Sequence, residues 1–185
     1  MEHSQKEEYA IILDFLPNGY PFDNKPMHRK LPIAQALGEK SFTLLELAPK
    51  KEVSLQPNQK VYIGDGKREE IHHIIGKITL SKLTQTARGE VELIIKELVT
   101  RNQQPFLDFF NKCGPINARR HQLELLPGIG KKHMWEIIEQ RKDKPFESFE
   151  DIKNRIKLLP DPEKSVIRRI LAELDEEDKY RIFTR

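Results

Sequence analysis

The chain has 185 residues, of which 37% are hydrophobic and 33% are charged, and its formal net charge at pH 7 is +3. This length accommodates one or two domains with hydrophobic cores, and no apolar run approaches the roughly 20 residues of a membrane-spanning helix. The N-terminal segment lacks the apolar core of a signal peptide and Cys113 is the only cysteine, so the sequence predicts a cytoplasmic protein without disulfides and without membrane contact.

Residues 1–81 are predicted to form a small antiparallel β-barrel. Apolar, β-branched runs separated by Pro, Gly, Asn and Asp clusters indicate strands at 9–16, 42–47, 60–63 and 71–80. The segment 33–38 is expected to form one or two helical turns that end at its glycine. Short antiparallel strands with one long connection resemble an OB-type barrel, a likeness at the level of fold only.

The long connection after the first predicted strand carries two aromatic residues and a cluster of positive charges. Tyr20 and Phe22 are followed by Lys25, Arg29 and Lys30. Aromatic rings interleaved with cations suit base stacking and phosphate neutralisation on a single-stranded nucleic acid. The alternative is a loop whose aromatic rings only cover the end of the barrel.

Neither the histidines nor the cysteine indicates a metal site. His72 and His73 are adjacent on a predicted strand, so we expect their side chains to leave opposite faces, one toward the core and one toward solvent. None of the six histidines has a partner at a spacing typical of metal ligands, and Cys113 is interpreted as structural. The sequence therefore predicts no metal and no cofactor.

Residues 82–115 are predicted to be a helical connector. An amphipathic pattern indicates a long helix from Ser81 to about Asn102. Pro105 interrupts the helical hydrogen bonding, and a second helix is expected to begin at Phe106.

Residues 116–185 are predicted to be all-α, and their central feature is the run Leu125–Lys132. Asn117 is expected to cap a helix over 117–126, and apolar residues at 134, 135, 137 and 138 predict a second helix that begins after Gly130. Gly128 and Gly130 permit a tight turn between these helices. Free N–H groups and a positive dipole at the second helix N-terminus, with lysines beside them, predict an anion site.

The run Leu-Leu-Pro-Gly-Ile-Gly-Lys-Lys between two short helices resembles the helix-hairpin-helix motif of nucleic-acid-binding proteins. The resemblance implies that the amides of the turn hold a backbone phosphate without reading bases. Residues 117–160 carry ten Lys and Arg against seven Asp and Glu, which agrees with a weak, salt-sensitive phosphate site. The alternative is a simple interhelical turn. The predicted contact residues are Pro127, Gly128, Ile129, Gly130, Lys131, Lys132, Arg119 and Arg120.

A second hairpin is predicted from an internal repeat. Ser148 is expected to cap a third helix, and Leu158–Leu171 repeats Leu125–Ile138 with an offset of 33 residues. In this register Asp161, Pro162 and Glu163 replace the Gly-Ile-Gly triplet. Because carboxylates repel a phosphate, the second hairpin is expected to be structural, and the pair is expected to be asymmetric.

The whole order of elements resembles the archaeal domain-of-unknown-function 655 family, in which a small OB-like barrel precedes a tandem helix-hairpin-helix domain. The resemblance implies a non-catalytic protein that binds RNA, or alternatively DNA. A protein-interaction scaffold is a second interpretation. A nuclease or glycosylase is a third, with Asp151 as its candidate catalytic residue, although Ser148 is expected to occupy Asp151 in a helix cap; the sequence predicts no catalytic residue.

Overall fold

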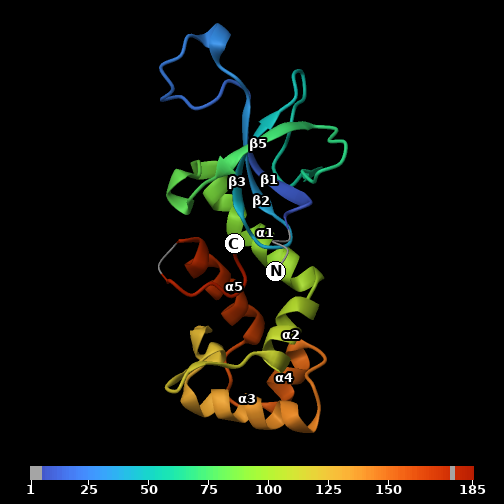
Figure 1. Ribbon diagram of the computed structural model, residues 1–185, viewed down its shortest axis with the longest axis vertical. Helices are drawn as coiled ribbons and strands as arrows, with labels where there is room; N and C mark the ends of the chain where they lie inside the picture. Colours follow the sequence, from blue (N-terminus) through green and yellow to red (C-terminus); the bar gives the residue numbers. More distant parts are fainter. Residues whose placement is uncertain (1–5, 176–177) are drawn as a thin grey trace. The chain divides into compact units, whose positions relative to one another are not determined.

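The computed structural model describes residues 6–175 and 178–185 and has an α+β architecture (Figure 1). Residues 1–5, at the start of the segment that lacks a signal-peptide core, and residues 176–177 lie outside the described residues. The strands are β1 (Tyr9–Leu16), β2 (Ile33–Gly38), β3 (Leu44–Pro49), β4 (Lys60–Tyr62), β5 (Ile71–Lys77), β6 (Pro115–Asn117) and β7 (Arg120–His121). The α-helices are α1 (Gln85–Arg101), α2 (Gln104–Lys112), α3 (Lys131–Asp143), α4 (Phe149–Arg155) and α5 (Pro162–Leu174), with short 3-10 helices η1 (Met27–Arg29), η2 (Leu80–Lys82) and η3 (Gln122–Leu125).

The backbone divides into two compact units. Unit 1 contains the residues up to Ile94 together with those from Glu173 onward, and unit 2 contains Ile95–Ala172. The predicted boundaries of a barrel at 1–81, a connector at 82–115 and a hairpin domain at 116–185 stay a prediction.

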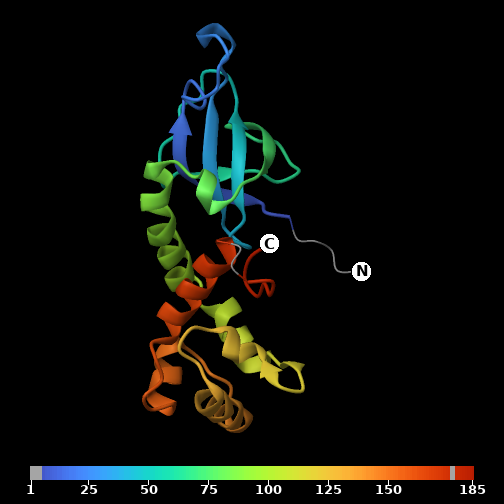
Figure 2. The same ribbon diagram turned by 90° about the vertical axis from the view of Figure 1, so that its left-hand side faces the viewer.

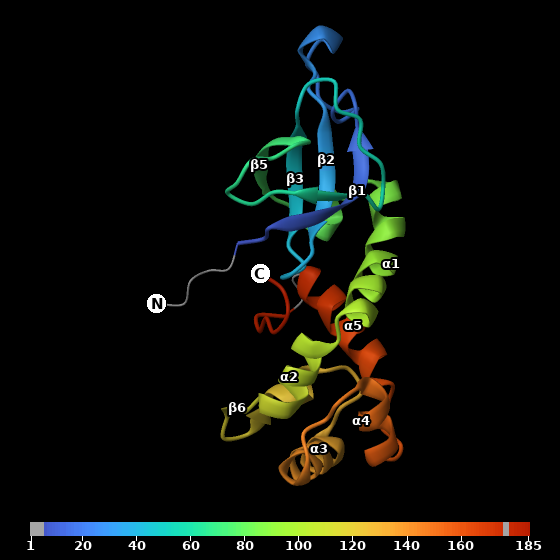
Figure 3. The same cartoon turned by 90° about the vertical axis from the view of Figure 1, so that its right-hand side faces the viewer.

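Unit 1 contains a five-stranded antiparallel sheet in the order β4-β1-β2-β3-β5, which curls into a half-barrel (Figure 3). The sheet is open, because β4 and β5 stand at its two ends. The predicted strand at 9–16 is confirmed, whereas the predicted helical turn at 33–38 is wrong. That segment is the central strand β2, which pairs with β1 on one side and with β3 on the other. These two ladders override a local pattern that also suits a short helix.

One face of the sheet carries a hydrophobic cluster that includes Ile12, Leu47 and Ile71. Ile11 and Leu13 alternate to the other face of β1 and are buried as well, so this strand is covered on both sides. The start of α1 is attached to the sheet by Thr84. The hydroxyl of Thr84 donates to Asp14 at 2.6 Å and accepts from the N–H of Ala87 at 3.1 Å, which caps the helix.

Unit 2 contains most of the helices, and several of their boundaries follow from local chemistry. Pro105 lies in the first turn of α2, and the Ser148 hydroxyl caps α4 by accepting from the N–H of Asp151 at 2.9 Å. The prediction that residues 116–185 are all-α is wrong, because residues 115–121 form the β6–β7 hairpin and residues 122–125 form the 3-10 helix η3. No helix in the described part of the chain has both the length and the apolar character needed to cross a membrane.

The predicted N-cap role of Asn117 is wrong for a local reason. Its side-chain oxygen accepts from the N–H groups of Arg119 and Arg120, at 2.8 and 3.0 Å. This side-chain turn reverses the chain between β6 and β7, and the resulting hairpin forms in place of the predicted helix. His121 then caps η3 in a capping box with Glu124.

Candidate nucleic-acid interface

The first turn, residues 126–130, connects η3 to α3. A hydrogen bond of 3.1 Å from the N–H of Ile129 to the carbonyl of Leu126 closes it. Gly128 has φ +85°, a left-handed conformation that a Cβ atom would make costly. Leu126 and Ile129 are buried, whereas Gly128 and Gly130 are exposed, so the apolar residues attach the turn to the core and the glycines face solvent.

The N-terminus of α3 lies directly after this turn and is not capped by a side chain. Gly130 is the N-cap, and its carbonyl accepts from the N–H of Met134 at 2.9 Å. Within residues 6–175 and 178–185, the N–H groups of Gly130, Lys131 and Lys132 donate to no protein acceptor. These N–H groups and the positive end of the helix dipole form a position that favours an anion.

The four predicted cations near the first turn have different surroundings. The ammonium group of Lys131 donates to the carbonyl of Arg119 at 2.6 Å and pairs with the Glu124 carboxylate at 3.1 Å. Lys132 is exposed and pairs with no carboxylate of the described chain, so its charge remains available to a ligand. Arg119 and Arg120 are exposed at the β6–β7 hairpin.

The ion pair between Lys131 and Glu124 is part of a small polar cluster that shapes η3. The Glu124 carboxylate accepts from the N–H of His121 at 2.7 Å, and this hydrogen bond lowers the pKa of Glu124 below its ordinary value. Nδ1 of His121 accepts from the N–H of Leu123 at 3.1 Å. Burial, and then the nearby positive charge of Arg141, lower the pKa of His121, which agrees with a neutral ring that accepts a hydrogen bond.

The second turn, residues 156–161, repeats two features of the first. Leu158 has φ +64° and is exposed, as Gly128 is, and buried Ile156 corresponds to buried Leu126. The offset between the turns is therefore 30 residues, from 128 to 158, and the predicted offset of 33 is wrong. The Leu-Leu-Pro repeat indicated the wrong offset because the helix after each run begins at a different distance from it. The helix α3 begins four residues after Pro127, whereas α5 begins two residues after Pro160.

Asp161 fills the helix N-terminus that follows the second turn. Its side-chain oxygen accepts from the N–H groups of Glu163 and Lys164, at 3.0 and 3.3 Å. Asp161, Pro162 and Glu163, which were predicted to replace the glycines of the turn, therefore lie at the N-terminus of α5. The N-termini of α3 and α5 therefore differ. The carboxylate of Asp161 accepts hydrogen bonds from the free N–H groups of α5, whereas the N-cap of α3 is Gly130, which has no side chain.

The second turn and the helix α5 that follows it pack against the first turn within unit 2. The Ser165 hydroxyl donates to the carbonyl of Pro127 at 2.8 Å, and the buried guanidinium of Arg169 donates to the carbonyl of Leu125 at 3.3 Å. A Cβ atom at Gly128 would lie 2.8 Å from Cγ of Pro160. Gly128 is therefore required both by its backbone conformation and by the close approach of the second turn. A Cβ atom at Gly130 would meet nothing within 4 Å.

The loop between β1 and β2 extends beyond the sheet (Figure 2) and holds the predicted aromatic pair. The Tyr20 hydroxyl donates to Glu46 at 2.5 Å and accepts from the Gln35 amide at 3.0 Å. Burial, followed by the hydrogen bond to Glu46, raises the pKa of Tyr20 to about 12. Phe22 stacks on Tyr20 with 5.0 Å between ring centroids and 11° between ring planes. Phe22 is 78% exposed, so Tyr20 anchors the pair and Phe22 presents it.

The same loop carries charges and further apolar side chains. Arg29 is exposed at the end of η1, and Lys30 is partly exposed. Met27 and Leu31 are large, exposed hydrophobic residues that no sequence pattern indicated. Their signal is weak, because isolated apolar residues in a loop are common on protein surfaces.

Comparison with known proteins assigns the chain to a family. The family model described as a protein of unknown function, DUF655, matches residues 6–185. The chain belongs to the DUF655 family. A curated relative in Methanocaldococcus jannaschii, "Uncharacterized protein MJ0038", is 45% identical over 181 residues, which cover 97% of this chain and 80% of the relative. The crystal structure of Af1531 from Archaeoglobus fulgidus, a DUF655 family model, matches with a TM-score of 0.85 and 44% identity over 97% of this chain and 100% of that chain.

The histidines of this DUF655 chain lie differently from the prediction. His72 and His73 are both exposed, and their Nδ1 atoms are 2.8 Å apart. The expectation of opposite faces is wrong because the pairing of β3 with β5 shifts register beside His73, which breaks the regular alternation. Cys113 is buried, and burial raises the pKa of its thiol. Among the described residues, no group of three His, Cys, Asp or Glu side chains could hold a metal ion.

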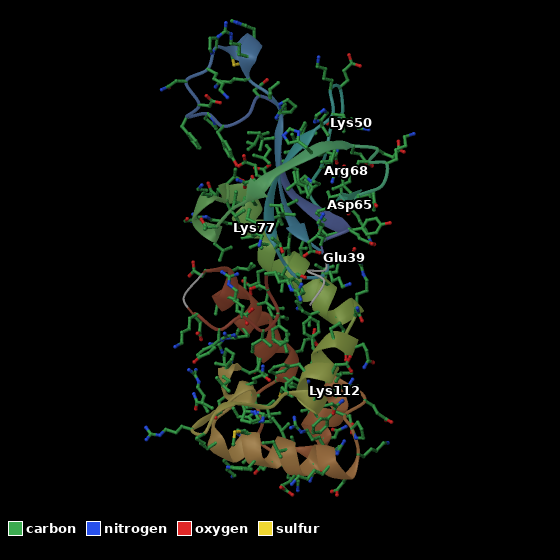
Figure 4. The ribbon with its side chains drawn as sticks, viewed as in Figure 1. Glu39, Lys50, Asp65, Arg68, Lys77 and Lys112 are labelled. Atoms are coloured by element: carbon green, nitrogen blue, oxygen red, sulfur yellow. The ribbon has the colours of Figure 1, made fainter. Side chains whose placement is uncertain are left out.

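Other charged side chains of unit 1 are engaged in local contacts. The Lys50 ammonium group donates to the carbonyl of Arg68, and both residues lie in the same outer region of unit 1 (Figure 4). Lys60 pairs with Glu39 at 2.8 Å. These contacts distinguish such lysines from Lys132, whose charge has no such partner in the described chain.

Trp135 belongs to the apolar stripe that predicts the helix α3, but the structure does not bury it with the rest of that stripe. Met134 and Ile137 are buried, but Trp135 is 58% exposed. A narrower apolar stripe through residues 134 and 137 would have left Trp135 outside the core. The DUF655 chain thus carries an exposed indole on the helix whose N-terminus is open to an anion.

Proposed function

We propose that this protein is a non-catalytic nucleic-acid-binding protein that prefers RNA and holds a backbone phosphate at the N-terminus of α3. One observation carries the proposal: the N–H groups of Gly130, Lys131 and Lys132, beside an exposed glycine turn, find no acceptor among the residues that the structure describes. The exposed ammonium group of Lys132 supplies a full positive charge at the same place. Such contacts address the sugar-phosphate backbone and carry no direct sequence information.

The finer fold assignment is part of this proposal. We interpret the half-barrel as OB-like, and we interpret η3 to α5 as a tandem helix-hairpin-helix pair. The pair is supported by two turns that each contain one residue with positive φ and that pack on each other through Gly128 and Pro160. The open N-terminus of α3 and the capped N-terminus of α5 favour one phosphate contact over two symmetric ones.

The loop between β1 and β2 supplies the argument for single strands. Phe22 presents a ring that already stacks on Tyr20, and Arg29 and Lys30 lie a few residues along the same loop. An exposed ring beside cations suits an unstacked base with its phosphate, and unstacked bases are common in single-stranded RNA. RNA is therefore the polymer that we expect this protein to bind most tightly.

A catalytic role for Asp151 is less well supported than binding. One carboxylate oxygen of Asp151 accepts from the N–H of Glu147 at 3.1 Å and pairs with Arg155 at 3.3 Å. The N–H of the same residue donates to the Ser148 cap. This carboxylate is committed to the start of α4, so we propose that it is structural.

A protein-interaction scaffold is the second candidate, and the exposed Met27 and Leu31 favour it. The two candidates are separated by measuring affinity for single-stranded RNA, duplex RNA, single-stranded DNA and duplex DNA over a range of salt concentrations. We expect binding to all four, tightest to single-stranded RNA, with affinity that falls as salt rises. Absence of binding to every polymer at low salt would contradict the proposed function and favour the scaffold.

The decisive variant is Gly130→Asp, which gives the first turn the carboxylate that Asp161 gives the second. The backbone of Gly130, with φ −98° and ψ −169°, accepts any residue, and a Cβ atom there meets nothing within 4 Å. Aspartate is also a favourable N-cap, so folding should be preserved. Because charge-assisted hydrogen bonds to the phosphate are lost, affinity should fall by about 10- to 100-fold.

The matched control is Gly89→Asp, which adds the same charge at an exposed position of α1 where a Cβ atom also meets nothing within 4 Å. Its affinity should stay close to that of the wild type. Lys132→Gln should also reduce the salt dependence, lowering the slope of log affinity against log salt by about 0.7 for a single strand. Equal affinities of Gly130→Asp and Gly89→Asp would exclude the α3 N-terminus as the phosphate site.

A further inference from the structure

Trp135 is the one tryptophan of the chain, and its indole is 58% exposed on α3. The neighbouring residues Met134 and Ile137 are buried and face the core, whereas the indole lies on the solvent side of α3. No ring stacking or cation contact joins the indole to another side chain of the described residues. This large apolar ring therefore has no stacking partner among the described residues.

The indole lies close to the open N-terminus of α3. Trp135 follows Lys131 by four positions and Lys132 by three, and residues at these spacings share one face of a helix. The rise of about 1.5 Å per residue separates the Cα atoms of residues 131 and 135 by about 6 Å along the axis. Because helical side chains generally lean toward the helix N-terminus, we expect the indole to lie toward the free N–H groups.

The charges around the indole favour an anionic ligand. Lys132 is exposed and has no carboxylate partner in the described chain. On the following turn the negative charge of Glu139 is paired, because Glu139 lies 2.7 Å from the ammonium group of Lys142. An apolar ring beside an available cation and free N–H groups matches the alternation of base and phosphate along a nucleic-acid strand.

We propose that Trp135 stacks on an unpaired base adjacent to the phosphate held at the α3 N-terminus. This inference rests on the proposed function and narrows its ligand to a strand with unstacked bases. In a duplex, both faces of each internal base are covered by neighbouring bases, so the indole cannot contact them without unstacking. In a single strand or a loop, a base can turn onto the ring, and base stacking on an aromatic side chain is sequence-tolerant.

The fluorescence of Trp135 provides a direct test, because no other tryptophan contributes. Wild-type protein is titrated with a single-stranded RNA oligonucleotide, with an oligonucleotide of the same length that keeps the phosphates but lacks the bases, and with a blunt duplex. The single strand should quench the indole fluorescence on binding. The base-free strand and the duplex should bind through phosphates and leave the fluorescence nearly unchanged.

Variants then measure the contribution of the ring to affinity. Trp135→Ala should weaken binding of the single strand by about 5- to 150-fold, and Trp135→Phe should retain most of the affinity. Neither change should alter binding of the base-free strand. Leu93→Ala is the matched control, since Leu93 is also a large exposed apolar residue on a helix, α1, and its loss should not change affinity.

The possible outcomes separate this inference from the proposed function. If no polymer binds the wild type, the proposed function fails and the inference fails with it. If Gly130→Asp weakens binding as expected, but Trp135→Ala binds the single strand as tightly as the wild type and the wild-type fluorescence does not change on binding, only the inference is overturned. Equal quenching by duplex and single strand, or equal loss of both in Trp135→Ala, would also overturn it.

Discussion

Replacing Gly128 with alanine should destabilise unit 2 far more than the same change two residues later. The Gly128 backbone has φ +85°, and a Cβ atom at this residue would lie 2.8 Å from Cγ and 3.3 Å from Cβ of Pro160. Gly130 has φ −98° and open space at its Cβ position. The two glycines belong to the same turn and differ in backbone conformation and in the space available for a Cβ atom.

The magnitude for Gly128→Ala follows from two terms of the same sign and one of the opposite sign. A left-handed conformation costs an alanine about 1–2 kcal/mol, and overpacking against the second turn adds about 1–3 kcal/mol. The reduced entropy of the unfolded chain offsets about 0.4–1 kcal/mol of this. The free energy of unfolding should therefore fall by about 1–4.5 kcal/mol, whereas Gly130→Ala should change it by about 0.5 kcal/mol or less.

Urea denaturation monitored by Trp135 fluorescence reports on unit 2, because the single tryptophan lies in α3. A double-mutant cycle with Pro160→Ala isolates the clash, and the coupling free energy should recover about 1–2 kcal/mol of the cost of Gly128→Ala. Similar unfolding free energies for Gly128→Ala and Gly130→Ala, or a coupling near zero, would refute the reasoning that Gly128 is required by the contact between the turns.

Three further predictions concern stability. Leu158→Gly should raise the free energy of unfolding by about 0.5–1 kcal/mol, because Leu158 is 88% exposed at φ +64° and loses strain without losing burial; an unchanged urea midpoint would contradict this. The pKa of His121 is lowered in the folded state, so its contribution is fully present above pH 6.5 and is lost as pH falls below that value; His121→Gln should flatten this part of a stability profile, and a parallel profile would count against it. Buried Glu173 accepts from the N–H groups of residues 182, 183 and 184 at 2.7, 3.0 and 2.9 Å; Glu173→Ala should speed amide exchange at these three positions, and unchanged exchange would show that the tail is held by other contacts.

Much of the architecture could be predicted because it is encoded by short-range patterns. The strand at 9–16, the break at Pro105 and the Ser148 cap each depend on residues within a few positions of one another. In contrast, the segment 33–38 has no decisive local pattern and becomes β2 only because β1 and β3 pair with both of its edges. Partners that lie far along the chain are not visible in a local window.

The candidate site shows the same division. Gly128 at a turn, Gly130 at a helix N-terminus and two lysines after it were all readable, because backbone freedom and helix polarity are local properties. The difference between the lysines was not readable. Lys131 is occupied by Glu124 from the preceding 3-10 helix, and Lys132 is not.

The sequence alone determined that the chain is α+β, that a glycine turn precedes the helix at Lys131, and that the second Leu-Leu-Pro run lacks the glycines of the first. Only the tertiary structure decided that Trp135 faces solvent and that Leu158 holds the positive-φ position that Gly128 holds in the first turn. It also decided that Pro160 lies too close to Gly128 for a Cβ atom. The physical reason is that local patterns specify backbone conformation over a few residues. Which face of an element is buried, and which charge is paired, depend on residues that folding brings from elsewhere in the chain.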